Sequence, residues 1–158
     1  MTKIAPSTAV NRYYLARRTA AEVNERMSSR EGASEETGID RKLLQRIEIG
    51  TLNPYPEEVL LMADSYHAPE LLNYHCSHCC PIGQRTVPRA EASELDRITV
   101  KCLNALEEIK GADKALLSIA RDGVLTADEV PQMEAVLAGV RNLATIAAEM
   151  QIYLEKHK

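Results

Sequence analysis

Four long, hydrogen-bonding side chains lie close together in the stretch GIDRKLLQRIEIG, residues 38–50: Arg41, Lys42, Gln45 and Arg46. In the major groove of DNA, Arg and Lys can bond to guanine and Gln to adenine, and all of them can reach a phosphate. A helical step of about 100° per residue places Arg41, Lys42 and Gln45 on one side and Arg46 at its border. The opposite side is apolar: Ile39, Leu43, Leu44 and Ile47. The pattern therefore indicates either a helix that offers its charged side to DNA or the solvated surface of a small helical domain.

A second helix is expected directly before this one, in SREGASEET. It begins at a serine cap, Ser28 or Ser29, and ends before Gly38, which makes the turn. Inside it, Gly32 costs about 1 kcal/mol relative to alanine, so tertiary packing must hold the helix. Arg30 lies near its positive end, where the side chain can contact a phosphate. Two helices joined by a short turn predict a helix-turn-helix, in which the second helix enters the major groove.

The stretch GIDRKLLQRIEIGTLNPYPEEVLLMADSY resembles the signature of the XRE, or Cro and phage-repressor type, helix-turn-helix family. The resemblance is carried by Gly38, Ile39, Arg46, Ile47, Glu48, Gly50, Asn53, Pro54, Ala63, Asp64 and Tyr66. The strings NRYYLARRTAAEV, SREGASEETG, APELLNYHCSHCCPIG and ARDGVLTADE also look like a subgroup found in bacterial genomes and prophages.

This resemblance implies a fold of five helices with a helical tail, and sequence-specific binding of double-stranded DNA. It implies base contacts at Arg41, Lys42 and Gln45 and backbone contacts at Arg30 and Arg46. In the family, the residue that corresponds to Glu48 usually pairs with an arginine of the first helix, which would be Arg17 or Arg18 here.

The remaining N-terminal residues also show helical rather than alternating apolar spacing, so no strand is expected and the fold class is all-α. A first helix is predicted over residues 11–27, a fourth in EEVLLMADSY after Pro56, and a fifth in PELLNYHC. Asp40 is the expected cap of the third. The predicted inward residues of the first helix are Tyr14, Leu15, Ala20, Val23 and Met27, and those of the fourth are Val59, Leu60, Met62, Ala63 and Tyr66. These five helices define a predicted DNA-binding domain over residues 1–83.

PIGQRTVP is predicted to be a linker or a tight reversal, and residues 84–158 are predicted to form a helical hairpin. One apolar stripe consists of Leu95, Ile98, Cys102, Leu106, Ile109, Leu116 and Ala120, and the other of Val130, Met133, Leu137, Val140, Ala144, Ala147 and Leu154. Their spacing alternates mostly between three and four residues, as in a bundle or coiled-coil seam. Gly111 is expected to break or kink the first helix, and Thr126 with Glu129 to form a capping box. The hairpin is expected to pack on the N-terminal domain or on a second copy.

The segment HCSHCC, residues 75–80, has two interpretations. Cys76, Cys79, Cys80, His75 and His78 offer ligands that zinc prefers, but they all come from one short stretch, with only Cys102 far away. The thiols can equally pack as small apolar groups where a helix ends. The sequence leaves the metal open, and no other cofactor is expected.

Composition and charge narrow the function. The stretch from residue 12 to residue 46 contains eight basic and six acidic residues, although the whole chain has a formal net charge of −4. Any DNA affinity should therefore be modest and sensitive to salt. No apolar run is long enough to cross a bilayer and no signal peptide is evident, so a cytoplasmic protein is expected. No motif indicates an enzyme. The expected function is that of a homodimeric DNA-binding regulator, a repressor of a mobile element. The alternative is a protein-interaction module on a helix-turn-helix scaffold that has lost DNA binding.

Overall fold

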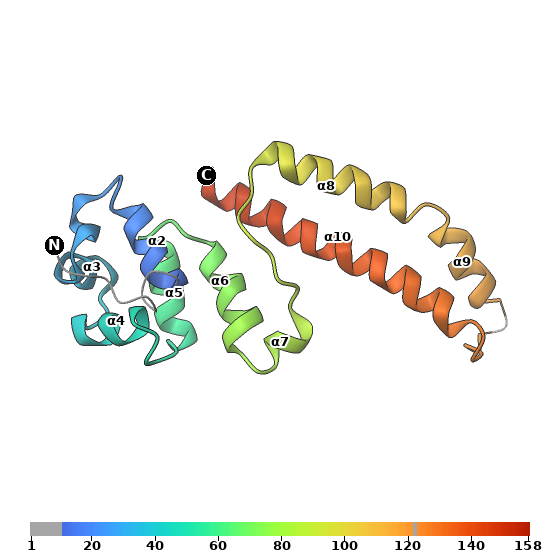
Figure 1. Cartoon of the computed structure of the whole chain (residues 1–158), viewed down its shortest axis with the longest axis horizontal. Coiled ribbons are helices and arrows are strands. Elements are labelled where there is room, and N and C mark those ends of the chain that lie inside the picture. Colours follow the sequence, from blue (N-terminus) through green and yellow to red (C-terminus); the bar gives the residue numbers. More distant parts are fainter. Residues whose placement is uncertain (1–10, 122) are drawn as a thin grey trace. The chain divides into compact units, whose positions relative to one another are not determined.

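The computed structural model describes residues 11–121 and 123–158, and every regular element in these ranges is a helix (Figure 1). The prediction of an all-α fold class is thereby confirmed for the described residues. The chain divides into two compact units, Met1–Val87 and Pro88–Lys158. No helix in the described ranges is both long enough and apolar enough to span a bilayer.

The N-terminal unit consists of short helices with well-defined ends. They are α2 (Arg12–Ala20), a 3-10 helix (Glu25–Ser28), α3 (Arg30–Thr37), α4 (Arg41–Glu48), α5 (Pro56–Ser65), α6 (Glu70–Tyr74), a π-helical turn (His75–Cys79) and α7 (Gly83–Thr86). The side chains of Asn11, Ser29 and Asp40 accept hydrogen bonds from backbone N–H groups at the starts of α2, α3 and α4. Pro56 opens α5, as predicted, because a helix's first residue needs no N–H.

Two sequence expectations for this unit are wrong. The first helix ends at Ala20 instead of residue 27, because the Ala20 carbonyl accepts the N–H groups of Val23 and Asn24 in a turn. Val23 is consequently 94% exposed rather than buried, and Leu15 and Leu60 also lie mostly outside the core. PIGQRTVP, for which a linker or a tight reversal is predicted, contains the single helical turn α7. Its first residue, Gly83, approaches the Cys76 carbonyl so closely that a Cβ would lie 2.0 Å from its oxygen.

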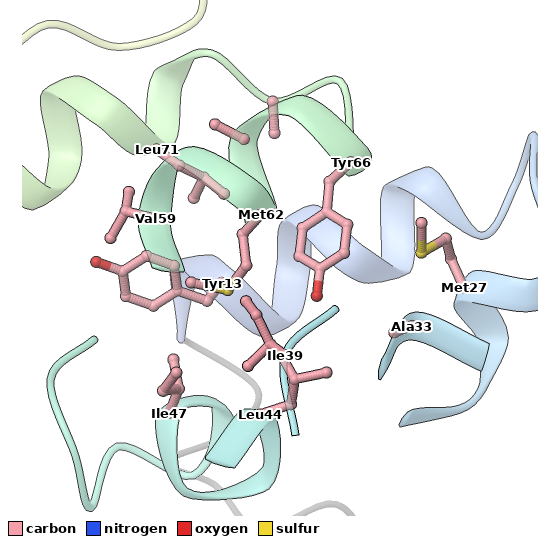
Figure 2. Packing of buried hydrophobic residues seen from close by; sticks show 12 residues of the cluster. Tyr13, Met27, Ala33, Ile39, Leu44, Ile47, Val59, Met62, Tyr66 and Leu71 are labelled. Atoms are coloured by element: carbon pink, nitrogen blue, oxygen red, sulfur yellow. The ribbon is translucent and has the colours of Figure 1, made fainter. Parts of the chain in front are cut away.

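The core of the N-terminal unit draws side chains from every long helix of the unit (Figure 2). Its buried members are Tyr13, Met27, Ala33, Ile39, Leu44, Ile47, Val59, Met62, Ala63, Tyr66, Ala68 and Leu71. Because α4 contributes Leu44 and Ile47 to this core, its opposite side must face outward. The core thus determines which residues of α4 are available to a partner.

The C-terminal unit consists of α8 (Leu95–Glu108), α9 (Ala112–Ile119) and α10 (Val130–Lys156). Gly111, with φ +88°, separates α8 from α9, as the sequence predicts. The Glu129 carboxylate accepts the backbone N–H of Thr126 at 2.9 Å, so the expected interaction between these residues forms just before α10. α10 returns along α9 and α8 (Figure 1). Ile98 and Ala105 of α8 pack with Ile146 of α10 in a buried cluster.

The apolar stripe expected for α10 does not face α8. The side chains that pack on α8 include Leu143, Ile146 and Tyr153, whereas Leu137 and Val140 are exposed. α10 is apolar over an arc wide enough for two neighbouring stripes, and periodicity does not tell which of them faces the partner helix. The expected stripe of α8 and α9 is also partly outside the core, since Leu95, Leu106 and Leu116 are exposed.

Candidate nucleic-acid interface

The connection between α3 and α4 is short and held by specific hydrogen bonds. Gly38 has φ +72° and donates its N–H to the Ser34 carbonyl at 2.9 Å, which ends α3 in the left-handed conformation that glycine favours. The Ser34 hydroxyl donates to the Ile39 carbonyl at 2.6 Å. The buried Thr37 hydroxyl donates to the Ala33 carbonyl at 2.7 Å and accepts the Ile39 N–H at 3.2 Å. These bonds set the direction in which α4 leaves the turn.

α4 presents the predicted polar side chains on its exposed surface. Asp40 caps the helix by accepting the N–H groups of Lys42 and Leu43. The exposed side chains are Arg41, Lys42, Gln45 and Arg46. Arg41 pairs with Glu31 of α3 at 3.2 Å, but both side chains are about half exposed or more, so solvent screens this contact. The four donors therefore form one row along a helix whose other side is buried.

Arg30, the fifth predicted site residue, lies against an ion-pair cluster behind this row. The Glu48 carboxylate accepts Nε and a terminal nitrogen of Arg17 at 2.5 and 3.1 Å, and Nε of Arg30 at 2.7 Å. Arg17 also donates to the Met27 carbonyl at 2.7 Å. The side chains of Arg17 and Glu48 are almost wholly buried, whereas that of Arg30 is 29% exposed. Of the two arginines considered in α2, Arg17 is the partner of Glu48, and Arg18 is exposed.

The cluster keeps the buried guanidinium of Arg17 charged. Burial alone would lower the pKa of Arg17, but the hydrogen bonds and the charge of Glu48 outweigh it and raise that pKa above its ordinary value. Burial also raises the pKa of the nearby Tyr66 hydroxyl, and the Glu48 carboxylate adds to this effect. The Glu48 carboxylate at the end of α4 thus links the end of α2, through Arg17, to the start of α3, through Arg30.

A further anchor, Arg26, was missed by the sequence reasoning. It pairs with Glu35 at 2.7 Å and with Glu36 at 2.8 Å, both in the last turns of α3. Two carboxylates near a helix C-terminus oppose the helix dipole, so a nearby cation is needed to compensate them. That unfavourable placement is the sequence signal from which the anchor could have been inferred. The buried Ala33 and Thr37 hold the polar helix α3 against the core, and the exposed Arg26 pairs add little because solvent screens them.

The segment His75–Cys80 joins α6 and α7 to α2. The Tyr13 hydroxyl lies 3.3 Å from Nδ1 of His75 and 3.9 Å from Sγ of Cys79, and the Gly83 N–H donates to Sγ of Cys80 at 3.4 Å. Burial and the neighbouring Cys79 thiol raise the pKa of Tyr13, so its hydroxyl remains protonated. Across residues 11–121 and 123–158, no three His, Cys, Asp or Glu side chains are grouped as metal ligands. The contacts in this segment are those of a helix end packed against its neighbours.

His75 is expected to make the N-terminal unit sensitive to acid. Burial lowers its pKa from an ordinary value of 6.5, so the unfolded chain takes up the proton at a higher pH than the folded chain. The stabilisation by the neutral ring is complete above about pH 6.5 and is lost as the pH falls from there through the folded pKa. The midpoint of urea unfolding should therefore drop between about pH 7.5 and about pH 5.5, and His75→Gln should reduce that drop. His157→Gln, at an exposed position, is the control, and an equal drop in all three proteins would contradict the prediction.

Comparisons of the chain with models of protein families, with curated proteins and with solved structures found no match. The class defined by the structure is an all-helical protein in the residues described. No relative assigns a role to any side chain, so a function has to be argued from the surface of α4 and its supports.

Proposed function

We propose that α3 and α4 form a helix-turn-helix of the XRE type and that the protein is a sequence-specific regulator that binds double-stranded DNA in the cytoplasm. We further propose that it represses genes of a phage or another mobile element. The observation that carries this proposal is the exposed row of Arg41, Lys42, Gln45 and Arg46 on a helix whose other side is buried. Such a helix has the one-sided supply of donors that base reading in the major groove requires.

The dimensions and charges are compatible with this proposal. The eight residues of α4 span about 12 Å, close to the width of the major groove. Arg41, Lys42 and Gln45 are assigned to base edges and Arg46 to the backbone. Glu48 engages Nε of Arg30, and the rest of this partly exposed guanidinium can reach a phosphate. In this arrangement Glu48 supports a DNA contact without touching DNA itself.

One copy of α4 would bind weakly, because the local positive excess is small. Regulators of this type gain affinity by presenting two recognition helices to half-sites about one helical turn apart. The proposed function therefore includes a homodimer.

The test is binding to DNA from the region flanking the protein's own gene, measured by electrophoretic shift and fluorescence anisotropy over a salt series. The triple variant Arg41→Ala, Lys42→Ala, Gln45→Ala should bind at least about 100-fold more weakly, since each good base contact contributes about 1–3 kcal/mol. Its affinity should also depend less on salt. The matched control is Arg97→Ala, Lys114→Ala, Gln132→Ala, which removes the same side-chain types from exposed positions of the C-terminal unit.

The control should bind DNA as the wild type does, and far-UV circular dichroism should show that both variants are folded. Unchanged binding by the α4 variant would remove this helix from the mechanism. If the control variant weakens DNA binding equally, the loss of affinity reflects the overall charge of the protein and not the contacts of α4.

The second candidate function is a protein-interaction module on the same scaffold. It is favoured by the acidic net charge and by the pairing of Arg30 and Arg41 with Glu48 and Glu31, which occupies cations that DNA would need. A folded protein that binds none of the flanking DNA even at low salt would favour this function over the proposed one.

A further inference from the structure

The C-terminal unit has an apolar surface that its own helices leave uncovered. We call it the hairpin face and define it by Leu95, Leu103 and Leu106 of α8 and by Met133, Leu137, Val140, Ala144, Ala147 and Leu154 of α10. Its five leucines and Val140 are between 41% and 62% exposed. Monomeric proteins seldom leave such a continuous apolar surface in water, so the hairpin face needs an occupant.

The two helices contribute to the same side of the hairpin. Viewed along each helix from its N-terminus, the exposed residues are rotated in the same direction from the buried ones. On α8 the exposed leucines are rotated from Ile98 and Ala105, and on α10 the exposed residues are rotated from Leu143 and Ile146. α8 and α10 run in opposite directions (Figure 1). An equal rotation away from the contact between them therefore brings the exposed residues of both helices to the same side of the hairpin. The other side is polar: there Lys101 pairs with Glu149 at 2.8 Å, beside a cavity of about 280 Å³.

The spacing on α10 indicates that the occupant is a long helix. Its outer apolar positions are 130, 133, 137, 140, 144, 147 and 154, and Gln151 fills the one remaining place in the alternation of three and four. A strict seven-residue repeat keeps one stripe of a helix against a partner helix along its whole length, which a flat or irregular partner does not require. A single polar residue in such a stripe is a known means of selecting one register.

The length of the stripe identifies the partner helix. α10 has 27 residues and is therefore about 40 Å long, whereas the described helices of the N-terminal unit have four to ten residues. α8 and α9 already occupy the neighbouring stripe of α10. The matching helix on a second copy is α10 itself.

Area and charge agree with a symmetric pair. α10 is about 40 Å long and α8, with 14 residues, about 21 Å; at about 10 Å width each, they present together roughly 600 Å² per partner, the lower end of the range for standard stable interfaces. Glu134, Arg141 and Glu155 lie beside the stripe on the side away from α8, with alternating charge. In an antiparallel pair, a carboxylate of one copy can meet Arg141 of the other, and the two-fold axis repeats the contact.

We propose that the hairpin face is the homodimer interface, in which two copies pack α10 against α10 in an antiparallel pair with α8 alongside, as a four-helix bundle. This interface deepens the proposed function by giving the surface that would join two recognition helices. Its own test needs no DNA, so either idea can fail without the other.

The test is the mass of the full chain in solution, measured by sedimentation equilibrium over a concentration series without DNA. The wild type should be a dimer at low micromolar concentration. Leu137→Glu with Val140→Glu should raise the dissociation constant at least about 100-fold, because four carboxylates would be buried in each dimer. The control, Ala138→Glu with Asn142→Glu, places the same charges at exposed positions of α10 away from the hairpin face and should leave the dimer intact.

A second pair, Leu103→Glu with Leu106→Glu, tests the α8 half of the hairpin face and should also give monomers. Circular dichroism checks that each variant is folded. A monomeric wild type at tens of micromolar, as expected if the N-terminal unit covers the face, would overturn the proposal. A dimer that survives both folded pairs of substitutions would overturn it as well. The Arg41, Lys42 and Gln45 alanine variant should remain dimeric, so loss of DNA binding and loss of dimerisation are distinguishable.

Discussion

Replacing Glu48 by alanine is expected to lower the free energy of unfolding by about 3–5 kcal/mol, because the change leaves the guanidinium of Arg17 buried without its counter-charge. Arg17 and Glu48 are 3% and 1% exposed, and two hydrogen bonds join them. After the substitution only the bonds of Arg17 to the Met27 and Ser28 carbonyls would remain. Since solvent cannot replace the lost carboxylate without opening the core, the cost falls on the folded state. The midpoint of urea unfolding, followed by circular dichroism, measures it.

Two variants show whether this effect belongs to burial. Glu31→Ala breaks the exposed pair with Arg41 and should change stability by less than about 1 kcal/mol. The double variant Arg17→Met, Glu48→Leu removes both buried charges and should be more stable than Glu48→Ala alone. If Glu48→Ala costs no more than Glu31→Ala, the cluster is not a structural centre of the N-terminal unit.

Two glycines inside helices should respond in opposite ways to alanine. At Gly32 of α3, a Cβ would lie 2.1 Å from the Arg26 carbonyl oxygen, which is backbone and cannot move aside cheaply. Gly32→Ala should therefore destabilise the protein by about 1–3 kcal/mol, although alanine is the better helix former. At Gly139 of α10, a Cβ would lie 3.5 Å from Cγ1 of Ile109, an ordinary contact. Gly139→Ala should stabilise the hairpin by about 0.5–1 kcal/mol.

Because both variants replace glycine by alanine inside a helix, each serves as the control for the other. Thermal and urea unfolding of the two variants and the wild type give the sign of each change, and amide hydrogen exchange assigns it to α3 or α10. Stabilisation by Gly32→Ala would mean that α3 does not approach the Arg26 carbonyl closely in solution. Destabilisation by Gly139→Ala would mean that α10 packs more tightly against Ile109 than the structure shows.

Much of the candidate site could be predicted because its features are local. The N-caps at Ser29 and Asp40 and the left-handed turn at Gly38 depend on residues within a few positions of each other. The buried and exposed sides of α4 follow from helical periodicity in eight residues, and the structure exposes the same four polar side chains. Whether these side chains bind DNA is a separate question, which the alanine variants address.

The errors occur where distant parts of the chain compete for the same residues. Val23 lies in a periodic apolar pattern, yet its side chain points outward because the chain turns after Ala20. Arg30 lies at a helix start, as predicted, but no local pattern indicates that Glu48, eighteen positions away, accepts its Nε–H. Gly32 reads as a weakness in α3, but it is the residue that admits the Arg26 carbonyl.

The sequence by itself determined the all-helical class, both ends of α3 and α5 and the start of α4 to within a residue or so, and the outward side of α4. Hydrogen bonds and periodicity within one helix are short-range, which is why they can be read from the sequence. Only the tertiary structure decided which stripe of α10 meets α8 and which arginine meets Glu48. Helix periodicity defines an apolar arc but not its partner, and an ion pair depends on where separate helices end in space. Packing between helices decides both contacts, and the residue pattern of a single helix contains no information about that packing.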